Sequence, residues 1–283
     1  MRNYKELIFR FVITIGTVLS SILVLLVFFY ILKESLPFFR EVSYNEFLLG
    51  SSWRPLSKNA EYSFLPMIMA TLYISFLAVL IAAPLGVGCS LFLSFCVKKS
   101  HSKIILSFID MLAGVPSVIF GFVGLVVLVK FLEQNIHMVS GESVLAGGIL
   151  VAVMLLPYVV SGSTEALEKG KNNYYIASQS LGVTKWYTMK SIILPFAANS
   201  IFTNILLAFS RAVGETMAVM MVTGNSPIFP KLMGRAETIP SLIALEMGTA
   251  AYKSIHYSAL YAAGLILMVV ILIIQLISYR LKR

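Results

Sequence analysis

Charged residues are scarce in this sequence. Only 12% of its 283 residues are Asp, Glu, Lys or Arg, whereas 58% are apolar, and the mean hydropathy is +0.88. A soluble globular domain has about 25% charged residues. The composition therefore excludes an ordinary water-soluble protein and indicates a chain embedded in a membrane.

Groups that could perform catalysis or hold a metal are scarce too. The two cysteines, Cys89 and Cys96, are too few for a disulfide framework, and they form no Cys-x-x-Cys motif. The three histidines, His101, His137 and His256, stand in segments that we expect to be solvated loops. The sequence also lacks the Gly-x4-Gly-Lys-Ser/Thr phosphate loop. We expect no metal site, no bound cofactor and no enzymatic activity in this chain.

Long apolar stretches occupy most of the sequence. A helix needs about 20 residues to cross about 30 Å of hydrocarbon. Six stretches meet this length, at residues 7–32, 65–95, 104–132, 144–163, 192–223 and 257–279. The first is too long for the apolar part of a signal peptide, so we expect it to remain as an anchor. The pattern predicts an all-α integral membrane protein with six transmembrane helices.

Basic residues are concentrated in alternate connections between these stretches. If both termini lie on one side, that side carries thirteen Lys or Arg and three Glu, whereas the other side carries eight basic and eight acidic residues. Basic connections stay in the cytoplasm, so we expect both termini to be cytoplasmic. The isoelectric point of about 9.5 follows from this topology and does not indicate nucleic-acid binding.

Three connections are long enough to fold. Residues 33–64 contain Trp53-Arg54-Pro55 and predict an interfacial helix or a small exterior lobe. Residues 164–191 are basic and have helical character on the inner side. Residues 224–256 contain three prolines and an apolar stretch that we expect to dip partly into the membrane.

Two opposite charges interrupt the fifth apolar stretch. Arg211 and Glu215 stand one helical turn apart within residues 196–222. An ionised side chain near the bilayer centre costs about 2.5–3.5 kcal/mol, so its presence favours a function, here the movement of a charged solute. The alternative is a permanent salt bridge that only orders the helix bundle. We place Asp110 about two turns into the third span, near its inner end, in a structural role.

The connection at residues 164–191 carries the most specific motif. Its segment Ala177-Ser178-Gln179-Ser180-Leu181-Gly182 is followed, after nine residues, by Ile192-Ile193-Leu194-Pro195. Small residues allow close docking, Gly permits a sharp turn, and Pro marks the start of the next helix. The motif resembles the Glu-Ala-Ala-x3-Gly-x9-Ile-x-Leu-Pro loop of ABC importer permeases, with Ile176 in place of the usual Glu.

That resemblance implies a short coupling helix that docks on an ATPase subunit. The residues implied in coupling are Ala177, Ser178, Gly182, Leu194 and Pro195. The alternative is an ordinary amphipathic helix in a cytoplasmic loop.

Three further stretches extend the resemblance, from about Trp53 to the carboxyl end. Residues 65–86, 110–121 and 211–219 resemble segments of the permeases of phosphate-specific ABC importers, the last two reading Leu-Ala-Gly-Ile-Pro-Ser-Val-Val-Tyr-Gly and Arg-Ala-x-Gly-Glu-Thr-Met-Ala-Val in that family. The ending Met217-Ala218-Val219 is similar to the PstC type rather than its sister, the PstA type. The resemblance implies a MetI-like ABC importer permease fold.

The resemblance also implies an assembly in the cytoplasmic (inner) membrane of a bacterium or archaeon. A PstA-like second permease would lie beside this chain, two PstB-like ATPases beneath, and a PstS-like phosphate-binding protein outside. Residues 1–64 would form an N-terminal helix with an exterior segment, and residues 65–283 a permease core with its coupling loop at about 164–191. Arg211, Glu215 and Thr216 would line the phosphate pathway, with Arg211 and Glu215 paired when no anion is present.

Four other interpretations remain open. In the first two, the chain is a PstA-type phosphate permease or a permease for another oxyanion such as sulfate or molybdate. It is an anion transporter or channel that works without ATP, although such proteins need no coupling loop. Finally, it is a scaffold or sensor subunit that transports nothing.

Overall fold

Six long apolar helical segments dominate the structure. The computed structural model describes residues 4–136, 138 and 140–281. Within them, six segments are long and apolar enough to cross a membrane, which confirms the predicted number. They are Phe9–Glu41, Leu65–Phe95, Ser117–Asn135, Val144–Ser180, Lys185–Val213 and Ile255–Leu281.

The described chain is helical apart from one short hairpin and its connecting loops. In chain order the elements are α1 (Tyr4–Glu41), α2 (Tyr44–Leu49), β1 (Trp53–Arg54), β2 (Glu61–Tyr62), α3 (Leu65–Phe95), α4 (Lys99–Ala113), α5 (Ser117–Val123), the π-helical turn η1 (Gly124–Val129), α6 (Lys130–Asn135), α7 (Val144–Ser180), α8 (Lys185–Tyr187), the π-helical turn η2 (Thr188–Ile193), α9 (Leu194–Val213), α10 (Met217–Val222), α11 (Ile239–Glu246) and α12 (Ile255–Leu281). Strands β1 and β2 pair antiparallel, with Trp53 opposite Tyr62.

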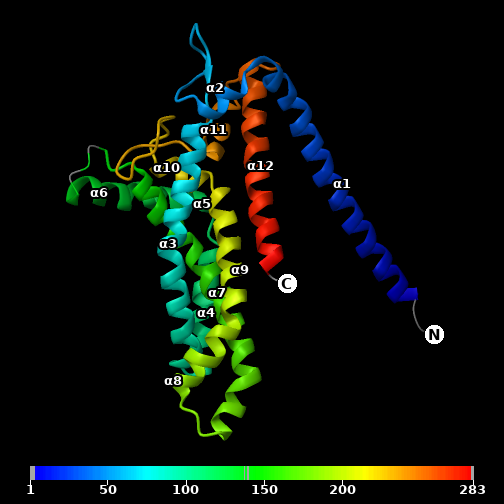
Figure 1. The fold of residues 1–283 in the computed structure, drawn as a ribbon, viewed down its shortest axis with the longest axis vertical. Helices are drawn as coiled ribbons and strands as arrows, with labels where there is room; N and C mark the ends of the chain where they lie inside the picture. The colour runs from blue at the N-terminus through cyan, green and yellow to red at the C-terminus, as the bar shows by residue number, and fades with distance from the viewer. Residues whose placement is uncertain (1–3, 137, 139, 282–283) are drawn as a thin grey trace.

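Helix α7 is the centre of the bundle. It packs against α3, α4 and α9, and 67% of its most apolar stretch is buried. In Figure 1, α3, α7 and α9 run side by side along the long axis of the molecule. One end of this bundle carries α2, the β1–β2 hairpin and α11, and we call it the lobe end. The other end is the connection between α7 and α8, and we call it the turn end.

Helix α1 diverges from the bundle as a separate arm (Figure 1). It packs against α12, where the rings of Tyr30 and Tyr261 meet edge to face at 5.8 Å. None of its most apolar stretch is buried. Both α1 and α12 direct their free ends away from the lobe end. The arm therefore presents an unpartnered apolar surface along almost its whole length.

The segment at residues 33–64 folds into a small aromatic lobe. Helix α1 continues through Pro37 to Glu41, and the lobe begins beyond it. Phe38, Phe47 and Phe64 pack against Trp53 and other buried residues of the lobe core. The indole Nε1 of Trp53 also donates to Glu246 Oε2 at 3.0 Å. The lobe is thereby bonded to the end of α11.

The third span differs from the prediction, which placed one helix at residues 104–132. Helix α4 ends at Ala113, Gly114 caps it, and a new helix begins at Ser117. The residue before a proline disfavours helical backbone, so Val115-Pro116 divides the span. Asp110 therefore lies in α4 and outside the third span, where its Oδ1 accepts a hydrogen bond from Ser161 Oγ of α7.

The helical character predicted for residues 164–191 is confirmed, but most of this connection belongs to a membrane-spanning helix. Residues 164–180 continue α7 without a break, and no separate helix forms there. Only four residues then separate α7 from α8. The turn end is therefore a continuation of a membrane-spanning helix.

The histidines do not lie in loops as predicted. His101 lies in α4 and is exposed, whereas His256 lies in the first turn of α12 and is buried. The Nε2 atom of His256 lies 2.7 Å from Glu246 Oε2. Apolar neighbours from the lobe cover this pair, which the sequence does not reveal. His137 lies outside the described residues.

Candidate functional site

The fifth span ends within the charged motif. Helix α9 ends at Val213, Gly214 caps it, and α10 begins only at Met217. The prediction that Arg211 and Glu215 stand one turn apart on one helix is therefore wrong. Gly is a poor helix former, and side chains that bond to nearby backbone compete with the helix. Thr216 Oγ1 donates to the carbonyl of Gly214 at 3.2 Å in this way.

Glu215 bonds to the backbone of the next helix. Its Oε1 accepts from the backbone N–H of Ala218 at 3.4 Å. A carboxylate in this position satisfies one of the N–H groups that have no partner at the start of a helix. Both Arg211 and Glu215 are described, and the structure gives no ion pair between them. The expected pairing of the two charges is absent here.

Arg211 is held by an aromatic ring. Its guanidinium carbon lies 4.3 Å from the centre of the Tyr158 ring in α7. Such a contact stabilises a cation by about 0.5–1 kcal/mol at an exposed site. The side chain remains exposed, and stacking leaves the edge of the guanidinium plane, with its N–H donors, open. Arg211 is therefore a positioned cation with donors available to an anion.

A polar groove lies between α7 and α9, about one turn from Arg211 toward the turn end. It holds a cavity of about 260 Å³ lined by Gly162, Glu165, Ala166, Lys169, Ser200, Thr203, Asn204 and Leu207. Sequence reasoning missed this groove. The signal was present as spacing, because Ser200, Asn204 and Arg211 recur at intervals of four and seven residues, on one face of a helix.

The turn end bears the residues predicted to couple to an ATPase. Gly182 adopts φ +70°, a conformation that suits glycine, and the N–H of Val183 returns to the carbonyl of Ser178 at 3.0 Å. The predicted sharp turn at Gly182 is confirmed. Ala177 is exposed, whereas Ser178 is buried and faces the interior.

Leu194 and Pro195 lie apart from that turn. They begin α9, beyond the π-helical turn η2, and Leu194 packs against an internal apolar cluster. Pro195 has no N–H to donate, so the ordinary helical hydrogen bond cannot form at this position. The wider π-helical turn η2 directly precedes it. The motif therefore supplies the turn with Gly182, as predicted, whereas Pro195 lies inside the helical segment Lys185–Val213, just after η2.

Large apolar side chains project from the turn end. Ile176, Leu181 and Trp186 are 76%, 82% and 68% exposed, and Tyr187 beside them is exposed too. We call these four residues the apolar tip. Contiguous exposed apolar surface of this kind marks an interaction site. The sequence alone does not show these four residues gathered at one end, because their common position depends on the folded turn between α7 and α8.

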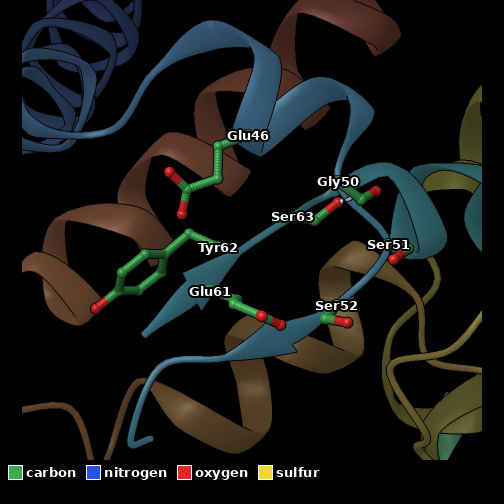
Figure 2. Close-up of a pocket in the computed structure, with 7 residues that line it drawn as sticks. All are labelled: Glu46, Gly50, Ser51, Ser52, Glu61, Tyr62 and Ser63. Atoms are coloured by element: carbon green, nitrogen blue, oxygen red, sulfur yellow. Dashed lines mark hydrogen bonds between the residues drawn. The ribbon is translucent and has the colours of Figure 1, made fainter. Parts of the chain in front are cut away.

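A second cavity lies in the lobe and is acidic. Figure 2 shows Glu46 of α2 together with Glu61 and Tyr62 of β2 around it. Burial, followed by the charges of Glu41 and Glu46, raises the pKa of Tyr62. Such surroundings repel an anion. Of these two cavities, the groove beneath Arg211 is therefore the better anion site.

Comparison with known proteins places the chain among membrane transport components. Residues 82–283 match the family described as binding-protein-dependent transport system inner membrane component. A probable ABC transporter permease protein YqgH of Bacillus subtilis is 36% identical over 246 residues, which cover 85% of this chain and 80% of that one. The phosphate transport system permease protein PstC of Mesorhizobium japonicum is 32% identical, covering 84% and 78%.

An archaeal relative and two solved structures agree with this placement. A probable PstC permease of Methanocaldococcus jannaschii is 31% identical, and the match covers 84% of this chain and 82% of the relative. A bacterial alginate ABC transporter superimposes with a TM-score of 0.65 at 18% identity, covering 100% of this chain and 98% of that one. The inward-facing MetNI methionine ABC transporter gives 0.58 at 15%, covering 75% and 90%. At these identities the two structures show a shared fold.

Proposed function

The chain belongs to the binding-protein-dependent transport system inner membrane components, as a permease subunit of an ABC importer, and we propose that it carries inorganic phosphate into the cell. Several relatives of about 30% identity are named as PstC phosphate permeases, and they span most of the chain. The relative from Bacillus subtilis is named only as an ABC permease, and the solved structures concern methionine and alginate. The choice of phosphate therefore depends on the site itself.

The single observation that carries the proposal is Arg211, stacked on Tyr158 and free of Glu215. A guanidinium offers a planar fork of donors that fits two oxygens of a tetrahedral oxyanion. Because no carboxylate neutralises Arg211 in this structure, an anion can bind without displacing one. Glu215 and Thr216 lie beyond the end of α9 but close to Arg211 in sequence. They limit how tightly the anion is held.

Coupling to ATP hydrolysis is assigned to the apolar tip. ATP hydrolysis belongs to separate subunits in this family, so the permease must contact them. Ile176 stands where the family has Glu, and it leads the row of exposed apolar groups. We assign the tip to a hydrophobic cleft on a PstB-like ATPase, with Ala177 and Gly182 shaping the turn that presents it.

A second permease is assigned to the exposed apolar surface of α1. The arm α1 buries none of its most apolar stretch, so a PstA-like subunit has a ready surface to pack against. The core that would form half of the pore begins with α3 at Leu65, directly after the lobe of residues 33–64. A PstS-like binding protein would deliver phosphate at the lobe end.

Orientation follows from charge. Lys169, Lys171, Lys185 and Lys190 surround the turn end, and the free ends of α1 and α12 point the same way (Figure 1). The positive-inside rule then assigns the turn end and both termini to the cytoplasm. The membrane would be the cytoplasmic membrane of a bacterium or archaeon.

Transport by a reconstituted complex tests this function. The chain is placed in liposomes with its sister permease, ATPase and binding protein, and ATP-dependent uptake of labelled phosphate is measured beside sulfate and molybdate. We expect phosphate-selective uptake that falls about a hundredfold in Arg211→Gln, because bonds to a charged group are lost. Arg211→Lys retains the charge without the fork and is expected to fall between. Arg54→Gln, an exposed arginine of the lobe, is the matched control.

Each other outcome points to a different function. ATP-dependent uptake of sulfate or molybdate would retain the importer and exclude phosphate as its substrate. Uptake that ignores ATP would indicate a secondary transporter or channel. Normal uptake by a correctly assembled Arg211→Gln complex would contradict the role of Arg211, and a complex without any uptake would favour a scaffold.

A further inference from the structure

The groove between α7 and α9 contains polar groups that the Arg211 site does not use. On α9 they are Asn204 and Ser200, about two and about three turns from Arg211 toward the turn end by residue spacing. On α7 the stripe starts at Tyr158 beneath Arg211 and continues through Gly162 to Glu165 and Lys169. The two stripes run antiparallel and face the same cavity of about 260 Å³.

These polar groups have no partners within the described structure. It gives no hydrogen bond or ion pair to the side chains of Ser200, Asn204, Glu165 or Lys169. Glu165 and Lys169, although four residues apart on one helix, are not paired. A polar stripe of this kind on membrane-spanning helices faces water or protein, because exposure to lipid is costly. The groove is therefore a face with polar groups available to water, solute or a partner subunit.

Gly162 makes room for the amide of Asn204. A methyl group on Gly162 would lie 2.7 Å from Asn204 Nδ2 and 2.9 Å from its Cγ. The two helices therefore meet closely at this level, with the amide of α9 seated directly over the backbone of α7. The lack of a side chain at residue 162 fixes where the donor of Asn204 lies.

We propose that this groove is a second oxyanion site, lying between Arg211 and the cytoplasm. The proposal rests on the proposed function. The amide of Asn204 and the hydroxyl of Ser200 donate to anion oxygens, and Lys169 attracts the anion toward the exit. Glu165 opposes that attraction, so that the anion does not remain bound. An anion leaving Arg211 thus meets donors again before it reaches water.

Removal of the amide tests the site. In the reconstituted complex, Asn204→Ala is expected to lower phosphate uptake about tenfold, since a donor to a charged group is lost. Asn199→Ala is the matched control, because Asn199 is an exposed asparagine of the same helix outside the groove, and we expect it to match the wild type. Assembly with the partner subunits and ATPase activity are measured for every variant.

A double variant separates a donor from a packing role. Gly162→Ala crowds Asn204 and is expected to lower uptake by itself. If Asn204 only packs, Gly162→Ala/Asn204→Ala restores wild-type uptake, because the methyl group then fills the space left by the amide. If Asn204 donates to the anion, the double variant stays as low as Asn204→Ala while assembly is normal.

The outcomes distinguish this inference from the proposed function. A wild-type complex that imports no phosphate defeats the proposed function and, with it, the second site. A wild-type complex that imports phosphate, together with normal uptake by Asn204→Ala or by the double variant, overturns the second site alone. Low uptake by both variants, with the Asn199→Ala control at the wild-type rate, supports it.

Discussion

At the scale of single residues, the structure replaces an ion pair with a cation held on a ring. Arg211 stacks on Tyr158, and Glu215 bonds to Ala218 instead. The ring orients the guanidinium but neutralises none of its charge. If Arg211 binds phosphate as proposed, Tyr158 is a positioning residue that acts on the substrate through Arg211.

The ring, and not the hydroxyl, is expected to matter at position 158. Tyr158→Phe retains the aromatic face and should leave phosphate uptake near the wild-type rate. Tyr158→Ala removes it and should reduce uptake several-fold, in keeping with a cation–π contact of about 0.5–1 kcal/mol. Uptake kinetics of both variants check this. Equal losses in the two variants would assign the effect to the hydroxyl.

Glu237 provides a pH-dependent feature outside the membrane-spanning helices. It is only 4% exposed, and burial, followed by the charge of Glu246, raises its pKa from 4.5 to about 7. The folded state therefore binds a proton that the unfolded state loses above pH 4.5. Below pH 4.5 this carboxyl favours folding fully, and that contribution is lost as the pH rises to about 7.

Glu237→Gln should remove this dependence. The variant keeps a neutral side chain at every pH, so its advantage over the wild type should be absent near pH 4.5 and grow to at most about 3 kcal/mol above pH 7. Thermal unfolding midpoints of both proteins in detergent, measured from pH 4.5 to 8, check the prediction. An advantage that does not change with pH would show that Glu237 titrates normally.

At the scale of elements, the break between α9 and α10 decides how the site is arranged. Gly214 caps α9 with φ −89°, which any residue can adopt, and a methyl group there would meet nothing closer than 3.7 Å. The break therefore depends on helix propensity and on the local bonds of Thr216 and Glu215. It does not depend on a special backbone angle.

Gly214→Ala should favour a continuous helix. Alanine is more favourable than glycine in a helix by about 1 kcal/mol, and a continuous helix would bring Arg211 and Glu215 one turn apart. We expect stable protein with reduced phosphate uptake, which the double variant Gly214→Ala/Glu215→Gln partly recovers. Uptake by the two variants measures this. If Gly214→Ala transports normally, the break is not needed to separate the charges.

The same elements show what the sequence can and cannot predict. Apolar length predicted all six spans, and the motif predicted the sharp turn at Gly182, because both are local properties. The sequence also contains the proline that divides the third span at Val115-Pro116, but the apolar residues on both sides favoured a single helix. The stack of Arg211 on Tyr158 depends on packing between α9 and α7, which residue spacing along one helix cannot provide.

At the scale of the whole molecule, apolar packing and a polar contact at Glu246 join the lobe to the core. Glu246, at the end of α11, accepts from Trp53 of the lobe and lies against His256 of α12. Both partners are buried, whereas the Glu246 side chain is 26% exposed, so Glu246 joins two buried groups at the edge of the core. A load placed on the lobe is therefore transmitted to α11 and α12.

The contact between α1 and α12 has a further consequence for synthesis. Tyr30 packs on Tyr261, so the first span finds its internal partner only when the last has been made. At about 5–20 residues per second, the ribosome needs roughly ten to fifty seconds to reach the second ring after making the first. During that interval the arm lacks its contact with α12. A chain truncated before α12 would lack this contact permanently.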